Sequence, residues 1–62
     1  MTKKEILAEM CDVINDNIDI FGYPYKWMLG KYYDNLNNIK KVVLERQLMK
    51  YKEIVEKANN IN

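Results

Sequence analysis

Residues 38–59 have the sequence NIKKVVLERQLMKYKEIVEKAN, and the rest of the chain is organised around them. It contains neither glycine nor proline, and residues that favour helices dominate it. We therefore predict one helix of about 20 residues, about 30 Å long at 1.5 Å per residue. Apolar residues recur along it at intervals of four and three, at Leu44, Leu48, Tyr51, Val55 and Ala58. That spacing is typical of a helix that packs lengthwise against other helices.

This helix carries a second apolar strip opposite the first. Ile39, Val42 and Met49 form it, whereas Val43 and Ile54 join the main band. A short chain is not expected to cover both sides of such a helix, so we predict a homodimer in which one strip meets a second copy. The candidate interface residues are Val42, Leu44, Gln47, Leu48, Met49, Tyr51 and Val55. Gln47 either fixes the register across a two-fold axis or reaches solvent at the edge of the band.

A first helix is predicted over residues 3–17. Thr2 and Glu5 have the spacing of a capping box, in which each side chain accepts a hydrogen bond from the other's backbone. The apolar residues that follow fall on one face of this helix. Cys11 lies at the edge of that face, so we interpret it as a small buried hydrophobic residue.

The opposite side of this helix carries a row of carboxylates. Glu5, Glu9, Asp12 and Asp16 follow the spacing i, i+4, i+7, i+11. Like charges one turn apart weaken an isolated helix slightly. The row is either a docking stripe for a basic partner surface or an ordinary solvated face.

A second helix is predicted over residues 24–34, with Pro24 at its first position. Before it, residues 18–21 form an apolar linker or a last helical turn, and we expect Ile20 and Phe21 to plug one end of the core. Trp27 and Tyr23 point away from the main apolar face of this helix. They are either a contact site for a partner protein or pack within the same subunit.

Residues 34–38 have the composition of a turn, and Asn38 is a suitable N-cap for the last helix. A kinked but continuous helix through this point is the alternative. The whole chain, residues 1–62, is therefore predicted to be one all-α domain with three helices, at about 3–17, 24–34 and 38–59.

The composition argues against catalysis. The chain has a net charge of +1, one cysteine and no histidine or serine, so it lacks the usual nucleophile–base pairs and Cys/His zinc ligands. We expect no enzyme activity, cofactor or metal, and a cytoplasmic location with a reduced thiol. Asn, Lys, Ile and Tyr make up 29 of 62 residues, which suits an AT-rich bacterial, phage or plasmid genome.

The leading hypothesis is a small regulatory protein, an adaptor, inhibitor or co-regulator, that binds another protein. Its partner would be an enzyme or a DNA-binding regulator, and its contact residues Glu5, Glu9, Asp12, Asp16, Tyr23 and Trp27. The alternative is a dimeric helix-turn-helix DNA-binding protein that uses Lys40, Lys41 and Arg46, which start the last helix. A structural assembly subunit is the third possibility.

Overall fold

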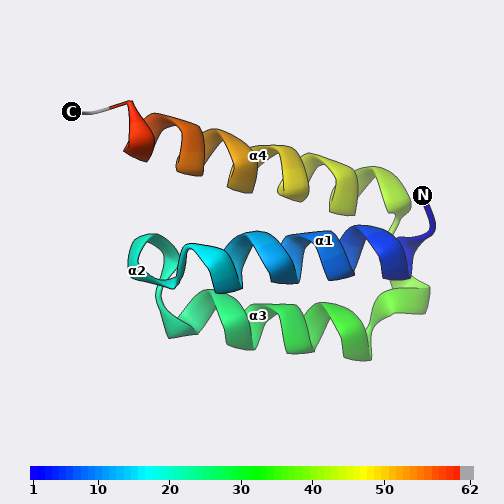
Figure 1. Cartoon of the computed structure of the whole chain (residues 1–62). Coiled ribbons are helices and arrows are strands. Elements are labelled where there is room, and N and C mark those ends of the chain that lie inside the picture. The colour runs from blue at the N-terminus through cyan, green and yellow to red at the C-terminus, as the bar shows by residue number, and fades with distance from the viewer. Residues whose placement is uncertain (61–62) are drawn as a thin grey trace.

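A computed structural model describes residues 1–60 of the chain as a layer of helices (Figure 1). The three long ones are α1 (Lys3–Asp16), α3 (Tyr23–Asp34) and α4 (Lys41–Asn59). A short helix, α2 (Ile18–Phe21), and a 3₁₀ turn, η1 (Leu36–Asn38), connect them, and these described residues contain no strand. The prediction of an all-α chain with three main helices is confirmed.

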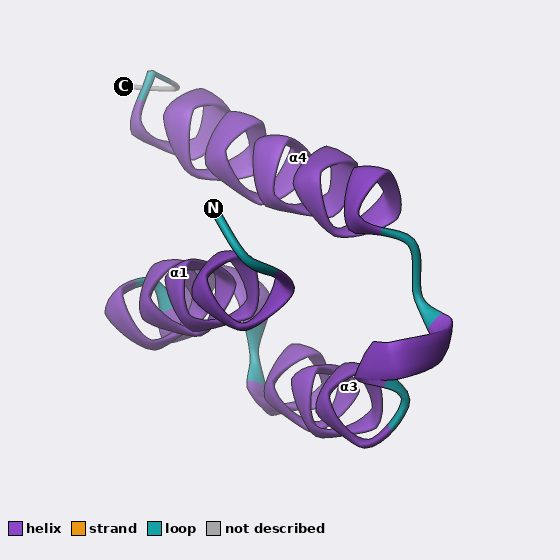
Figure 2. Ribbon diagram, turned by 90° about the vertical axis from the view of Figure 1, so that its right-hand side faces the viewer, coloured by secondary structure: helices purple, strands orange, loops and turns teal. Residues whose placement is uncertain are grey.

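Helix α1 occupies the middle of this layer. It packs against α4 on one side and α3 on the other, while α3 and α4 make few contacts with each other. α4 runs parallel to α1 and α3 runs antiparallel to both (Figure 1). Seen end-on, the three helices form an open arc with α3 and α4 at its two ends (Figure 2). The Cα atoms extend over 40 × 20 × 13 Å.

The start of α1 follows the predicted capping box. The Glu5 backbone N–H donates to Thr2 Oγ1 at 3.2 Å, and the Thr2 backbone N–H donates to Glu5 Oε1 at 2.8 Å. At the other end, Asn17 terminates the helix, and its side-chain amide donates to the Val13 carbonyl oxygen at 2.8 Å. Local side-chain chemistry therefore sets both ends of α1.

Residues 18–21 form a helical turn, α2, and not an irregular apolar linker. This turn is separated from α1 by Asn17. Gly22 follows with φ +80°, a conformation that favours glycine, and it separates α2 from α3. α3 begins at Tyr23, one residue earlier than predicted. Pro24 is therefore at the second position of this helix, whereas the sequence predicted it at the first. Phe21 is buried, and its ring packs edge-on against Tyr25 and Tyr51 with centroids 5.3 and 5.4 Å apart. The predicted plug at this end of the core is confirmed for Phe21.

The predicted start of the last helix is wrong. Asn38 ends the 3₁₀ turn, and Lys40, with ψ 141°, is the N-cap of α4. Leu36 and Ile39 are both half-buried against the core, and Ile39 is extended, with ψ 130°. The Lys3 ammonium also donates to the Leu36 carbonyl oxygen at 3.1 Å. These contacts hold the connection against α1 and break the helix, which also excludes one kinked helix through residues 34–41.

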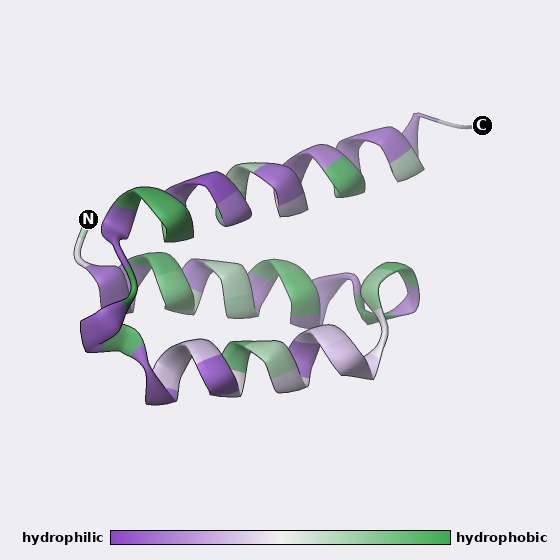
Figure 3. Cartoon of the chain, turned by 180° about the vertical axis from the view of Figure 1, so that it is seen from behind, coloured by the Kyte–Doolittle hydropathy of each residue, from purple (hydrophilic) through white to green (hydrophobic). Residues whose placement is uncertain are grey.

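The core lies along α1 and is entirely apolar apart from one tyrosine hydroxyl. Apolar and polar segments alternate along α1 and α4, as expected for helices with one buried face (Figure 3). The buried side chains are Ile6, Leu7, Met10, Ile14, Phe21, Leu29, Leu44, Leu48 and Tyr51.

Candidate functional site

The outer side of α3 presents two large aromatic side chains to solvent. Trp27 is 74% exposed and Tyr23 is 67% exposed. Among residues 1–60, nothing covers Trp27, so packing within the same subunit, one of the two alternatives from the sequence, is not seen there. We call these two residues the aromatic patch. Exposed neighbouring aromatics of this kind are typical of surfaces that contact other proteins.

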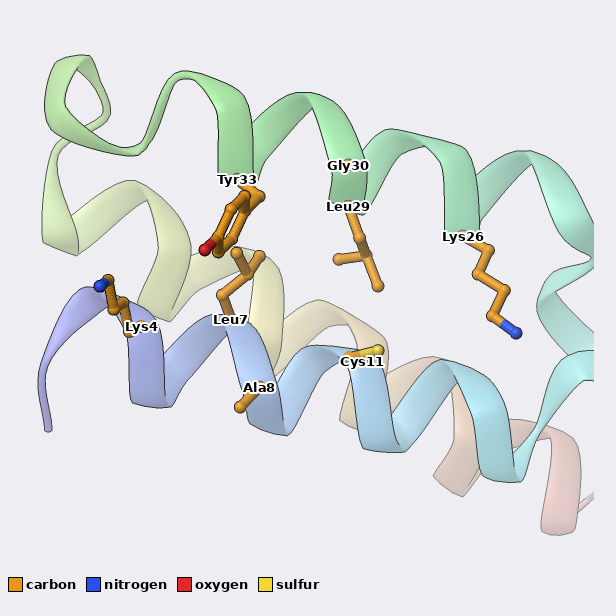
Figure 4. Close-up of a pocket in the computed structure, with 8 residues that line it drawn as sticks. All are labelled: Lys4, Leu7, Ala8, Cys11, Lys26, Leu29, Gly30 and Tyr33. Carbon is orange, nitrogen blue, oxygen red and sulfur yellow. The ribbon is translucent and has the colours of Figure 1, made fainter.

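Next to the aromatic patch, α1 and α3 enclose a groove of about 370 Å³ (Figure 4). We call it the α1–α3 groove. Leu7 and Leu29 form its floor and are almost fully buried, while the exposed Tyr33 ring covers one end (Figure 4). Lys4 and Lys26 lie at its opposite ends (Figure 4). Its lining residues are Lys4, Leu7, Ala8, Cys11, Lys26, Leu29, Gly30 and Tyr33.

Small residues open this groove. A Cβ added at Gly30 would meet nothing within 4 Å in the described part of the chain. Ala8 lies on the facing helix, and the half-buried Cys11 accepts a hydrogen bond from the Asn15 amide at 3.4 Å. Sequence reasoning missed the groove. The available signal was the placement of glycine, alanine and cysteine on the sides of two helices that pack together.

The structure divides the acidic row of α1 into two parts. Glu5 belongs to the capping box, and hydrogen bonds from the Thr2 backbone and side chain lower the pKa of its carboxyl. Glu9 Oε1 accepts from the Lys52 ammonium at 2.8 Å and so links α1 to α4. Both residues therefore have structural roles.

Asp12 and Asp16 are the exposed remainder of the row. Asp16 lies on the side of α1 that carries Glu9, whereas Asp12 lies one turn after Ala8, beside the rim of the α1–α3 groove. Among residues 1–60, no cluster of three or more metal-ligating side chains is close enough to hold an ion. Asp12 and Asp16 are thus the two carboxylates of the row that take part in no hydrogen bond or ion pair within the described residues.

The two apolar strips of α4 differ in their exposure to solvent. Leu44 is 0% exposed and Tyr51 is 2% exposed, and with Leu48 they pack against α1. Val55 is half-buried beside them. Burial within the chain leaves Leu44, Leu48 and Tyr51 almost no surface for the predicted dimer interface, whereas Val55 keeps part of its side chain open.

The second strip stays open to solvent. Val42 is 48% exposed and Met49 is 63% exposed, and we call this pair the α4 strip. Gln47 is half-buried and lies about 150° around the helix from both. It cannot share a two-fold contact with the α4 strip, so its predicted role in the pairing register is not supported by its position.

The residues of the DNA-binding alternative lie at the surface. Lys40, Lys41 and Arg46 are all exposed at the start of α4. However, α3 and α4 lie antiparallel on opposite sides of α1, whereas the two helices of a helix-turn-helix cross at about 90–120°. Lys40, Lys41 and Arg46 are therefore exposed, but the two helices around them do not have the crossing geometry of a helix-turn-helix.

Comparison with known proteins gave no match to a family model, to a curated protein or to a solved structure. Across residues 1–60, no helix combines the length and the apolar character needed to cross a bilayer.

Proposed function

We propose that this chain is a small protein-binding module, a non-enzymatic adaptor, inhibitor or co-regulator. The observation that carries the proposal is the solvent exposure of Trp27 and Tyr23 beside an apolar groove. Tryptophan and tyrosine dominate the binding energy of many protein interfaces, because they bury a large area with few rotatable bonds. A chain this small gains stability by burying such side chains, so their exposure supports a contact role.

The partner of the aromatic patch is a protein with a basic surface, such as a DNA-binding regulator. Asp12 and Asp16 supply exposed negative charge on α1 for such a contact. Their position on another face from Trp27 means that a partner must wrap around the edge of the helix layer to meet both. The aromatic patch is the primary contact, and the two aspartates add charge complementarity.

Self-association is the second part of the proposal. The α4 strip is apolar, exposed and separate from the aromatic patch. A second copy that covers Val42 and Met49 leaves Trp27 available for a different protein. A cytoplasmic location with a reduced Cys11, and a bacterial or phage origin, fit the single cysteine and the AT-rich residue usage.

The test is affinity capture with the tagged chain, compared with two variants of equal helicity. We expect the unmodified chain to retain a discrete protein that Trp27→Ala no longer retains. Met28→Ala is the matched control, because Met28 is also exposed on α3 but lies about 100° away around the helix. The proposal fails when the tag alone retains the same proteins, or when Trp27→Ala retains the partner as well as the unmodified chain does.

Direct DNA binding is the second candidate, favoured by the exposure of Lys40, Lys41 and Arg46. It predicts retardation of duplex DNA that weakens steeply with added salt, because phosphate contacts release counterions. Lys40→Gln combined with Lys41→Gln should then abolish the shift. Free migration of the duplex at low salt would remove this candidate.

A further inference from the structure

We propose that α4 exchanges between two copies of the chain, so that α4 of each copy packs on α1 of the other. This inference goes beyond the proposed function and uses neither the aromatic patch nor the α4 strip. The partner of α1 is then α4 of a second copy, and the contacts between them are those that the single chain already makes.

The contacts of α4 reach back to residues that precede the connection. α4 packs mainly on α1, and the Lys52 ammonium donates to Glu9 Oε1 at 2.8 Å. The Tyr51 ring packs edge-on against Phe21 and Tyr25, with centroids 5.4 and 5.9 Å apart. None of these contacts requires α4 to belong to the same chain as α1. A second copy therefore supplies all of them without a change in how the helices pack.

The direction of the helices allows the exchange. α3 and α4 are antiparallel and are joined at one end of the helix layer (Figure 1). When this connection straightens, α4 points away from its own α1 and toward that of a copy related by a two-fold axis. α3 of one copy then lies antiparallel to α4 of the other, as it does within the single chain. Such a contact is isologous and closes at two copies.

The connection has a nearly helical backbone over most of its length. Asn35 follows α3 with φ −113° and ψ 21°, and η1 continues over Leu36–Asn38. Ile39 and Lys40 are extended, with ψ 130° and 141°. Residues 34–41 contain no glycine or proline, and none of them has a positive φ. Rotation mainly at two residues therefore joins α3 and α4 in the exchanged form into one helix over residues 23–59, about 55 Å long.

The start of α4 favours this longer helix. Within the described residues, Lys40 is an N-cap whose side chain makes no capping hydrogen bond, and the first turn carries Lys41 and no acidic residue. Both ammonium groups oppose the positive end of the helix dipole. In the exchanged form there is no helix start at this point, because the preceding turn supplies backbone acceptors to the first N–H groups of α4.

Contacts of the connection favour the single chain. Leu36 and Ile39 are half-buried against the core, and the Lys3 ammonium donates to the Leu36 carbonyl oxygen at 3.1 Å. Asn37 and Asn38 are poor helix formers. Because α4 supplies a large part of the core, it leaves α1 only when the chain is largely unfolded. Dilute refolding therefore gives single chains, concentrated refolding gives exchanged dimers, and the two forms interconvert slowly.

The first test compares Lys40→Pro with Lys40→Ala. Proline is compatible with the single chain, because Lys40 has φ −71°, Ile39 is extended, and the Lys40 N–H donates to no backbone oxygen in the described residues. Proline is not compatible with the interior of the longer helix. Lys40→Ala removes the same side chain and leaves the backbone free. Each protein is refolded from urea at low micromolar and at several hundred micromolar concentration and separated by size-exclusion chromatography, and circular dichroism checks folding.

We expect concentrated refolding of the unmodified chain and of Lys40→Ala to give a dimer that persists after isolation and dilution. Lys40→Pro should associate at least about 100-fold more weakly, because the dimer would contain a proline within each long helix. Asn37→Ala combined with Asn38→Ala should raise the yield of dimer, since alanine favours the helix at both positions.

The second test identifies which helices meet. Glu9→Cys and Lys52→Cys, each combined with Cys11→Ala, are refolded together at high concentration and treated with a short bismaleimide. We expect a covalent dimer, because the ion pair between these two positions then spans two chains. In the control mixture Lys50→Cys replaces Lys52→Cys, and it should give no covalent dimer, since Lys50 lies about 160° away around α4.

Three results would overturn the inference. The first is a chain that stays monomeric after concentrated refolding, and the second is a dimer that Lys40→Pro forms as well as Lys40→Ala does. The third is a dimer that is lost in Met49→Glu and gives no covalent product in the first mixture, which would show that the α4 strips hold it. None of them affects capture of a partner through Trp27, so failure here is distinguishable from failure of the protein-binding function.

Discussion

Tyr51 is a single residue whose packing partner the sequence predicts wrongly: it was expected to contact a second copy of the chain. The helical spacing places it correctly on the main apolar band of α4, but its ring is buried within the chain between Phe21 and Tyr25. Its hydroxyl has no hydrogen-bond partner among residues 1–60. A buried hydroxyl without a partner loses its hydration and gains nothing in return.

Replacement of this hydroxyl should therefore not destabilise the protein. Tyr51→Phe keeps the ring contacts and removes the unpaired group, so we expect the free energy of unfolding to rise by about 1 kcal/mol. Urea denaturation followed by circular dichroism measures this change. A loss of 1 kcal/mol or more would show that the hydroxyl has a favourable contact. Tyr51→Ala provides the contrast, with an expected loss of about 3–5 kcal/mol.

The same residue makes stability depend on pH in the alkaline range. Burial raises the pKa of the Tyr51 phenol from 10.0 to about 12, with smaller contributions from Tyr32 and Tyr25. The unfolded chain therefore loses this proton at a lower pH than the folded chain does. The stability that depends on the protonated phenol is fully present below pH 10. It is lost as the pH rises to about 12, which lowers the free energy of unfolding by about 2–3 kcal/mol.

Tyr51→Phe lacks this group, so its free energy of unfolding should fall less steeply between pH 10 and 12. Denaturant titrations of both proteins at several pH values in that range measure the difference. The remaining tyrosines and the lysines are common to both proteins and cancel in the comparison. Parallel curves for the two proteins would contradict the raised pKa.

At the scale of the helix, the sequence predicts starts and ends well where a side chain makes them. The capping box of α1 depends only on Thr2 and Glu5, and it forms as the pattern predicts. The start of α4 depends instead on Leu36 and Ile39 reaching the core, which local sequence does not encode. For this reason Asn38, which has a suitable side chain for an N-cap, ends the 3₁₀ turn, and Lys40 is the N-cap of α4.

The N-cap of α4 is accordingly a place where one substitution should stabilise the chain. Lys40 occupies it, and within the described residues no side chain caps this helix. A lysine there also opposes the positive end of the helix dipole. Lys40→Asp should raise the free energy of unfolding by about 1 kcal/mol, since an aspartate accepts from the first free N–H groups.

Thermal unfolding compares Lys40→Asp with Lys40→Ala, which removes the charge but cannot cap. We expect the alanine variant to gain at most a few tenths of a kcal/mol from the loss of the unfavourable charge. Equal gains in the two variants would mean that the dipole, and not the cap, explains the effect. A loss in Lys40→Asp would place the start of α4 elsewhere.

At the scale of the whole molecule, the sequence shows that α4 has two apolar sides but not which neighbour covers each. Helical phase is a property of one element, so it correctly separates Val42 and Met49 from Leu44 and Leu48. Which band is covered depends on where α1 lies, and the α1–α3 groove depends on how two helices are placed together. The exposure of Trp27 likewise follows from the open arc, in which no helix of the described residues packs on the outer side of α3.

The central position of α1 leads to a contrast between two methionines. Met10 is fully buried on α1 between its neighbours, whereas Met49 is largely exposed on α4. Met10→Ala should cost about 2–5 kcal/mol through lost apolar contact and a cavity. A domain of this size has little stability beyond that amount, so we expect it to be largely unfolded at 25 °C.

Met49→Ala makes the same change in side-chain chemistry at the surface. At low micromolar concentration, where copies are mostly separate, its free energy of unfolding should stay within about 0.5 kcal/mol of the unmodified chain. Far-ultraviolet circular dichroism at 25 °C and a urea titration distinguish the two variants. Because the Met10 side chain is covered only when the helices are assembled around α1, similar losses in both variants would contradict the placement of α1 at the centre of the layer.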